Sequence, residues 1–284
     1  MRLFKYFHPD RTDVLLNGMI RFSSPKILND PFELKPYISG IADNDYLGAQ
    51  FEKNFTALIE EEYAQSPEQL RLAVSFEKFQ QFAEERKSSV LHGVREHTKK
   101  LTPKINSIIN NKFEEIIGIL CFTESAENIL MWAHYADSHQ GFVVEFDENS
   151  PFFNQRKSDE DEMRHLRKIV YRNERPAINL TDIDDLSSFL TKGIDWSYEQ
   201  EWRMMLPLVD ANKVIDDGSN RIHLFHYPKE AIRSIIFGCR SKVETKNAVF
   251  DAIGNLNIPC YQAKINDMHY KLDFHPISNR ELDS

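Results

Sequence analysis

The sequence has few cysteines and no membrane-spanning run. Cys121, Cys239 and Cys260 lie far apart in apolar, strand-like segments, without CxxC spacing and without histidines at zinc-ligand spacing. We therefore predict buried, reduced thiols and a reducing, cytoplasmic location. No segment approaches the roughly 20 apolar residues that would cross a bilayer, and the charged start, MRLFKYFHPDRTD, is unlike a secretory signal. We expect a soluble protein with no membrane partner.

Basic residues are outnumbered by acidic ones. The 284 residues include 35 Lys and Arg against 44 Asp and Glu, which gives a net charge of −9. This balance excludes a protein whose whole surface coats nucleic acid, because phosphate binding relies on clustered cations. A local basic surface remains compatible with it. The hydrophobic fraction of 41% excludes intrinsic disorder.

Several well-known catalytic motifs are also missing. The sequence contains no GxGxxG, Walker loop, GxSxG or HExxH, which disfavours Rossmann, P-loop, hydrolase-elbow and zincin chemistry. His134, Asp137 and His139 lie close in sequence, but on a helix two histidines five positions apart point in different directions. We expect no metal.

Apolar periodicity predicts an α+β fold. Strands are expected at residues 2–7, 19–23, 116–123, 142–147, 168–172, 221–227, 232–238 and, as the last one, 258–265. Helices are expected at 14–18, 125–141, 179–192 and 243–255, and from about 44 to 115 as a long helical insertion. Because no repeat or Gly/Pro-rich linker divides the chain, we predict a single domain over residues 1–284.

The insertion contains a basic stretch. Residues 84–112 carry seven Lys or Arg against three Glu, which gives +4. The stretch is either a solvated helical face or a surface that binds a partner.

The segment WSYEQEWRMML, residues 196–206, concentrates charge. As a strand it would place Glu199, Glu201 and Arg203 on one face, and that face should look into water or a polar cleft because buried charges are costly. As a helix it would form an apolar stripe from Tyr198, Trp202 and Met205, with the charges in solvent. Both interpretations stay open at this point.

Two further segments could bind a ligand. On the helix expected at 125–141, Met131, Tyr135 and Ser138 share a face, and Trp132 and Tyr135 beside His134 would either hold a planar ring or pack in the core. The loop after the second strand gathers hydrogen-bonding side chains, and loops at strand ends often carry sites. These side chains are Ser23, Ser24, Asn29 and Asp30.

The order of these motifs resembles a known family. FKYF, NG-x-IRFSSP-x4-DPFE, CF-x5-NILMWAHYADSHQGFVVEFD, W-x-YEQEWR and IIFG follow one another from residue 3 to about 240. The combination resembles a widespread, largely uncharacterised bacterial family with an NDPFE loop, an LMWxHYADxHxG helix and a YExEWR segment. That family is grouped by remote similarity with the ADP-ribosyltransferase superfamily, whose members split the nicotinamide–ribose bond of NAD and transfer ADP-ribose.

The resemblance implies an ADP-ribosyltransferase-like mixed sheet with NAD as a substrate. It assigns the late-strand catalytic Glu to Glu201, with Glu199 two positions earlier. The first-strand element is Lys5 or Tyr6, where the best-known classes have Arg or His, and the middle element is Ser23 or Tyr135.

Physical chemistry suggests roles for these side chains. A fixed Glu201 carboxylate would stabilise the positive charge that develops on the ribose, and Glu199 could orient or deprotonate the acceptor. The remaining NAD contacts are a cation for the pyrophosphate, an aromatic platform and polar loop groups. The candidates for the cation are Lys5, Arg21 and Arg203. Those for the aromatic platform are Trp132 and Tyr135, with His134 beside them, and those for the polar loop groups are Asn29 and Asp30.

The resemblance further implies a toxin or anti-phage effector paired with an inhibitor protein. The basic stretch favours a nucleic-acid acceptor, RNA before DNA, and a protein acceptor is the alternative. Two other classes stay open. One is a non-catalytic nucleotide-binding or partner-binding module, and the other is a hydrolase, such as a nuclease or NAD glycohydrolase, that uses Glu199 and Glu201.

Overall fold

The computed structural model describes residues 1–183, 186–216, 218 and 221–278. The chain divides into two compact units. The larger unit consists of Met1–Lys35, Lys112–Arg175 and Asp185–Ser284, and the smaller one of Pro36–Asn111 and Pro176–Asp184. Helices and strands alternate irregularly along the sequence, so the fold is mixed α+β.

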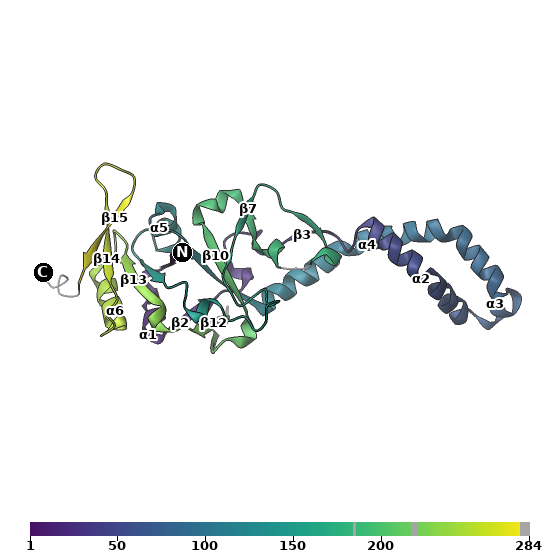
Figure 1. Ribbon diagram of the computed structural model, residues 1–284, viewed down its shortest axis with the longest axis horizontal. Helices are drawn as coiled ribbons and strands as arrows, with labels where there is room; N and C mark the ends of the chain where they lie inside the picture. Colours follow the sequence, from purple (N-terminus) through teal and green to yellow (C-terminus); the bar gives the residue numbers. More distant parts are fainter. Residues whose placement is uncertain (184–185, 217, 219–220, 279–284) are drawn as a thin grey trace. The chain divides into compact units, whose positions relative to one another are not determined.

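A mixed eight-stranded sheet forms the centre of the larger unit, as far as the described residues show (Figure 1). Most neighbouring strands are antiparallel, whereas β13 and β14 are parallel. Continuous apolar runs in β4 and β5 account for their burial on both faces. In spatial order the strands are β15 (Leu272–Ile277), β14 (Cys260–Ile265), β13 (Ile232–Phe237), β5 (Phe142–Phe146), β1 (Leu3–Phe7), β4 (Ile117–Thr123), β10 (Glu201–Pro207) and β6 (Arg167–Lys168).

The other strands of the described residues form smaller sheets. They pair β11 (Lys213–Asp216) with β12 (Arg221–His226) and β2 (Met19–Phe22), β7 (Val170–Arg172) with β9 (Thr191–Gly193), and β3 (Tyr37–Gly40) with β8 (Ala177–Asn179). Just after β2, Ser23 exchanges two backbone hydrogen bonds with Ile119 of β4. This bridge brings the end of β2 beside the central sheet.

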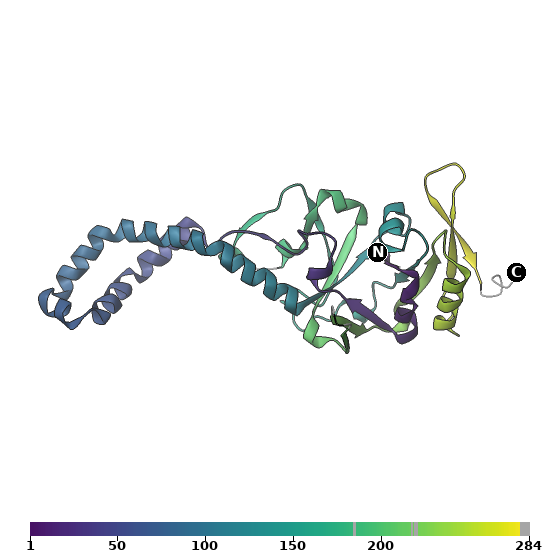
Figure 2. The same ribbon diagram turned by 180° about the vertical axis from the view of Figure 1, so that it is seen from behind.

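The helices are α1 (Asp13–Asn17), α2 (Asn44–Gln65), α3 (Glu68–Ala73), α4 (Phe76–Ile116), α5 (Ile129–Tyr135) and α6 (Val243–Ile253). In the smaller unit, α2 and the first part of α4 lie side by side (Figures 1 and 2). Phe51, Phe55 and Ile59 of α2 pack there against Phe76 and Phe79. The helices predicted from residue 44 onward are therefore present. Among the described residues, no helix has the length and apolar character needed to cross a membrane.

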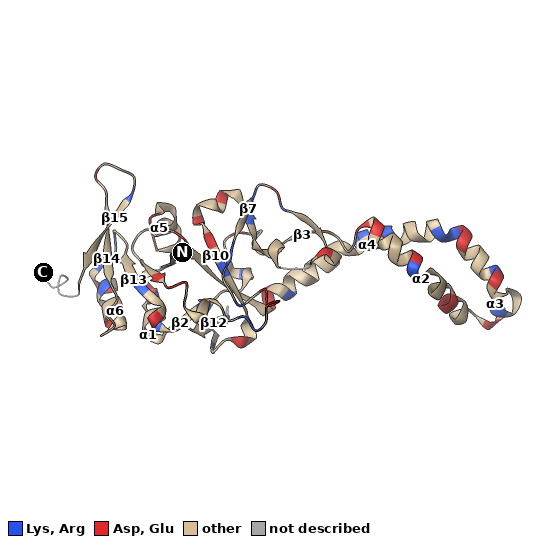
Figure 3. Ribbon diagram, in the orientation of Figure 1, with Lys and Arg blue, Asp and Glu red and all other residues tan. Residues whose placement is uncertain are grey.

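The basic stretch on α4 is not a continuous cationic surface. Figure 3 shows acidic and basic residues interleaved along these helices. Lys87 pairs with Glu52 at 2.7 Å, Lys99 with Glu96 at 2.9 Å and Lys112 with Glu115 at 2.7 Å. These three pairs neutralise part of its positive charge locally.

Three predictions about secondary structure are wrong. The helix expected at 125–141 is confined to Ile129–Tyr135, and Asp137, Ser138 and His139 that follow it all have positive φ. The segment 179–192 forms short 3-10 turns at Leu180–Asp182 and Ser187–Leu190 instead of a helix, with residues 184 and 185 outside the described part. Finally, β14 is not the last strand, because β15 follows it.

The cysteine prediction is confirmed in part. All three thiols are free, but only Cys260 is fully buried, and Cys121 and Cys239 are partly exposed.

Candidate functional site

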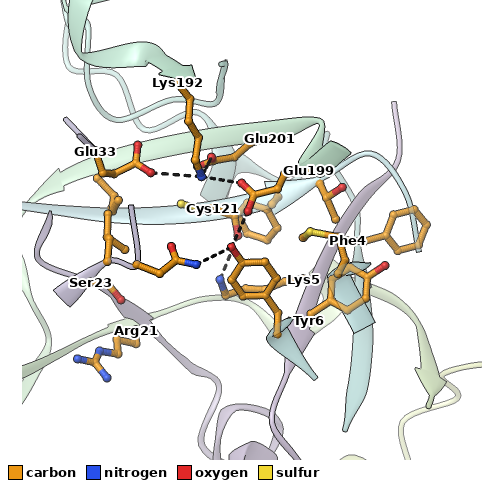
Figure 4. Close-up of a pocket in the computed structure, with 17 residues that line it drawn as sticks. Phe4, Lys5, Tyr6, Arg21, Ser23, Glu33, Cys121, Lys192, Glu199 and Glu201 are labelled. Carbon is orange, nitrogen blue, oxygen red and sulfur yellow. Dashed lines mark hydrogen bonds and ion pairs between the residues drawn. The ribbon is translucent and has the colours of Figure 1, made fainter. Parts of the chain in front are cut away.

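A cavity of about 170 Å³ lies in the larger unit, beside the middle of β1, the end of β2 and the start of β10 (Figure 4). Eight of the residues that the sequence singled out line it: Lys5, Tyr6, Arg21, Ser23, Asn29, Tyr135, Glu199 and Glu201. They come from segments far apart in the chain. The fold therefore brings together the first strand, the NDPFE loop, α5 and the YEQEWR segment.

The YEQEWR segment is helical in its first part and a strand in its second part, so each of the two predicted conformations holds for part of it. Ile194–Glu199 form a 3-10 helix, Gln200 adopts a positive φ of 46°, and β10 begins at Glu201. Only Glu201 and Arg203 therefore share a strand face. Glu199 reaches the same cavity from the preceding turn.

The NDPFE loop delivers a carboxylate that sequence reasoning did not select. The Asp30 carboxylate accepts a hydrogen bond from the Phe32 N–H at 2.9 Å, and the Glu33 N–H donates to the Asp30 carbonyl at 3.1 Å. This tight Asx turn is typical of Asp before Pro. It directs Glu33, which is 3% exposed, into the interior.

A buried ammonium connects the carboxylates. Lys192 Nζ lies 2.6 Å from Glu199 Oε2, 3.2 Å from Glu201 Oε2 and 3.2 Å from Glu33 Oε2 (Figure 4). Lys192 is on β9, in the segment that the sequence predicted as a helix. Because a helix was expected there, the sequence did not indicate that the Lys192 side chain contacts Glu199 and Glu201.

Arg203 completes the network through two of its carboxylates, those of Glu33 and Glu201. Its Nη2 lies 2.7 Å from Glu33 Oε1 and 2.6 Å from Glu201 Oε1. The Arg203 side chain is fully buried and does not line the cavity, so its predicted role as a cation for a pyrophosphate is not compatible with this position. The cluster of Glu33, Lys192, Glu199, Glu201 and Arg203 thus holds three carboxylates and two cations. We call it the ion cluster.

The pKa values of Glu199 and Glu201 are shifted in opposite directions. Burial alone would raise the pKa of Glu201, but the charges of Arg203 and Lys192 lower it to about 2. For Glu199, burial outweighs Lys192 and the Tyr135 hydrogen bond, so its pKa is raised. Glu201 is therefore a fixed anion, whereas Glu199 is the carboxyl group suited to exchanging a proton.

Around the acids, the cavity wall is aromatic and polar. The Tyr135 hydroxyl donates to Glu199 Oε1 at 2.5 Å and accepts from Asn29 Nδ2 at 3.2 Å. Lys5 Nζ donates to the Cys121 carbonyl at 3.0 Å, and burial lowers the pKa of this lysine. Tyr6, which is 7% exposed, donates to the Ser125 carbonyl at 3.1 Å.

The remaining candidates lie away from the cavity. Trp132 is 0% exposed, with its ring packed between Tyr6 and His139, and so offers no free face as a platform. His134 is exposed outside the cavity lining, and Asp30 is buried in its turn. In the described part of the chain, no group of three or more His, Cys, Asp or Glu side chains is arranged to hold a metal ion.

Comparison with known proteins finds a family model that matches part of the chain. A family model described as "Protein of unknown function (DUF2971)" matches residues 131–204 of the chain. The matched span includes Tyr135, Lys192, Glu199, Glu201 and Arg203, and it fits an uncharacterised bacterial family. No curated protein and no solved structure matched the chain.

Proposed function

We propose that the chain is an NAD-dependent ADP-ribosyltransferase. The observation that carries this proposal is that Lys5 and Tyr6 of the first strand, Ser23 after the second strand and Glu199 and Glu201 of the late segment line a single cavity. In the superfamily that the sequence resembles, the three-part signature comes from corresponding elements.

The ion cluster supports a division of labour between the two acids. Glu201, with a pKa of about 2, stays anionic and stabilises positive charge on the ribose as the bond between C1′ and the nicotinamide nitrogen breaks. Nicotinamide leaves with the bonding electron pair. The acceptor nucleophile then bonds to C1′ and loses its proton to Glu199, whose raised pKa suits a general base.

The size of the cavity limits which part of NAD it would enclose. At about 170 Å³, it is smaller than the roughly 300–1,000 Å³ of a pocket that encloses a drug-sized ligand. We expect the nicotinamide end to enter, near Tyr6 and Tyr135, and the rest of the dinucleotide to lie outside. Arg21, on the cavity wall, is the cation best placed to meet the pyrophosphate.

The proposed acceptor is a nucleic acid, RNA first, in the setting of a toxin or anti-phage effector held by an inhibitor protein. The test incubates the purified chain with labelled NAD and RNA, DNA or cell lysate, and follows nicotinamide release and label transfer. We expect release with the wild type and with Glu230→Gln, an exposed control in the same unit, and loss in Glu201→Gln. Release that persists in Glu201→Gln contradicts the proposal.

One observation favours a second candidate, a nucleotide-binding module without catalysis. Both Glu201 oxygens already accept bonds, Oε1 from Arg203 and Oε2 from Lys192, and the residue is 3% exposed. If this network holds Glu201 away from a ligand, NAD binds without being consumed. Calorimetric titration with NAD, run beside the release assay, separates the two: binding without nicotinamide release identifies the module.

A further inference from the structure

A second cavity in the larger unit is not used by the proposed chemistry. Its volume is about 450 Å³, within the range of ligand sites. One wall is formed by Ile129 at the start of α5 with His139, Cys239 and Arg240, and the other by residues 265–272 of the β14–β15 hairpin.

The hairpin presents apolar side chains to solvent. Ile265 is 70% exposed, Met268 83% and Tyr270 102%. Figures 1 and 2 show the loop between β14 and β15 extending beyond the neighbouring strands. An aromatic ring displayed in this way is available to stack on a ligand.

The loop nevertheless has a defined conformation. Asn266 Oδ1 accepts hydrogen bonds from the Met268 and His269 N–H groups at 2.9 and 2.7 Å, and Asn266 Nδ2 donates to Asp273 at 2.7 Å. The Asn266 N–H also donates to the Lys271 carbonyl at 3.1 Å. Tyr270 is thus held on an ordered turn, which reduces the entropy lost when a ligand binds.

Cations accompany the exposed ring. Within the described residues, Arg240 makes no ion pair, and its backbone N–H donates to the His139 carbonyl at 3.0 Å. Lys271 pairs with Asp273 at 3.2 Å, but this lysine is 53% exposed, and exposed pairs contribute little and exchange readily for another anion. Asp267 is the acidic residue of the lining. The available positive charges complement phosphate groups.

We propose that this second cavity, defined by Arg240, Met268, Tyr270 and Lys271 and called the hairpin site, binds a single-stranded nucleic acid. A base stacks on Tyr270, and phosphate oxygens bind Arg240 and Lys271. Stacking platforms flanked by cations are the general means of binding unpaired strands. A duplex, whose bases are already stacked, does not offer the free base face that this site uses.

The hairpin site adjoins the first cavity through α5. Ile129 of this helix lines the hairpin site, whereas Met131 and Tyr135 line the cavity beside the ion cluster. A strand bound at the hairpin site and passing over α5 reaches the first cavity. Only this further step, in which the bound strand is the ADP-ribose acceptor, rests on the proposed function.

Binding is tested without NAD, by fluorescence anisotropy of a labelled, unstructured oligoribonucleotide of about ten nucleotides, a length that one compact site can cover. We expect Tyr270→Ala to weaken binding at least about fivefold and Tyr270→Phe to retain it, because the ring supplies the stacking. Arg240→Gln should reduce the slope of log affinity against log salt by about 0.7, the value for one phosphate contact on a single strand. The matching deoxyribo-oligonucleotide distinguishes RNA from DNA.

Matched controls come from the smaller unit. Tyr46→Ala removes a tyrosine that is 46% exposed on α2, and Lys100→Gln with Lys104→Gln removes exposed charges of α4. If the wild type does not bind the oligonucleotide, the hairpin site is overturned. The same holds if the α4 variant loses binding while Tyr270→Ala and Arg240→Gln bind as the wild type does. Oligonucleotide binding without nicotinamide release supports the site and overturns only the proposed activity.

Discussion

At the scale of single residues, Lys192 is the side chain on which the ion cluster depends most. Its side chain is 4% exposed, and its ammonium lies within 3.2 Å of three carboxylates. Burial alone would lower its pKa, but those carboxylates raise it, so Lys192 remains charged. We predict that Lys192→Met lowers the free energy of unfolding by about 3–5 kcal/mol, because it leaves buried carboxylates uncompensated. Urea denaturation measures this.

Lys112→Met is the matched control for that measurement. Lys112 pairs with Glu115 at a similar distance, 2.7 Å, but its side chain is 68% exposed. Exposed pairs contribute about 0–1 kcal/mol, so this variant should unfold almost as the wild type does. Similar losses in the two lysine variants would mean that the ion cluster is no more important than a surface pair.

Glu199 gives a prediction about pH. Its pKa in the folded chain is raised above the ordinary 4.5, so ionising it costs folding free energy as pH rises from about 4.5 through the raised value. Glu199→Gln stays neutral and escapes this cost. The stability of the variant relative to wild type should therefore increase from acidic to neutral pH in thermal unfolding scans. A difference that is constant over this range, or that shrinks, contradicts the raised pKa.

Part of the site could be predicted, because Glu199, Glu201 and Arg203 concentrate charge in one short segment and the order of the motifs resembles a family with a late-strand Glu. The partners of these acids could not. Glu33 and Arg203 are separated by 170 positions, and local periodicity contains no information about such a pair. Glu33 is part of the NDPFE motif. That its side chain points into the interior follows from the Asx turn at Asp30, which the sequence pattern alone does not show.

At the scale of elements, the end of α5 shows what periodicity leaves out. The sequence prediction extended this helix to Gly141, a usual helix stop, yet the chain leaves the helix after Tyr135 and three consecutive residues, Asp137 to His139, have positive φ. The turn is fixed by backbone packing: the Arg240 N–H donates to the His139 carbonyl, and the Gly238 N–H donates to the Gly141 carbonyl at 2.9 Å. These contacts are tertiary, so the helix was predicted too long.

Gly238 tests this packing. A Cβ at Gly238 would lie 2.0 Å from the His139 carbonyl oxygen and 2.7 Å from its carbon, and backbone atoms cannot move aside as a side chain can. We predict that Gly238→Ala costs about 3 kcal/mol of unfolding free energy in urea denaturation. A loss below about 1 kcal/mol would show that the turn adapts easily.

Gly93→Ala on α4 is the opposite case and serves as its control. A Cβ there meets nothing within 4 Å, and alanine favours a helix interior over glycine by about 1 kcal/mol. Hydrogen exchange of α4 amides should therefore slow by about fivefold.

At the scale of the whole molecule, the strands of the central sheet were largely predictable because buried strands appear as continuous apolar runs, as in β4 and β5. β15 was missed because Leu272–Ile277 alternates apolar and polar residues over a short span, contains Pro276 and is only partly buried, so it lacks such a run. The segment 179–192 was misassigned because Asp, Ser and Thr side chains compete for nearby backbone groups and favour turns over helices, as the Thr191 hydroxyl does by donating to the Ser188 carbonyl at 3.1 Å.

At this scale the structure also shows how the charges that give the net charge of −9 are paired. On α4, Lys87, Lys99 and Lys112 pair with acids, and in the ion cluster three carboxylates face two cations, so ion pairing reduces the positive charge of both regions. An acidic chain of this kind repels nucleic acid except where a free cation lies near an aromatic ring. Among the described residues, Arg240 makes no ion pair and lines the same cavity as Tyr270, so any nucleic-acid binding should be local, sensitive to salt and dependent on few residues.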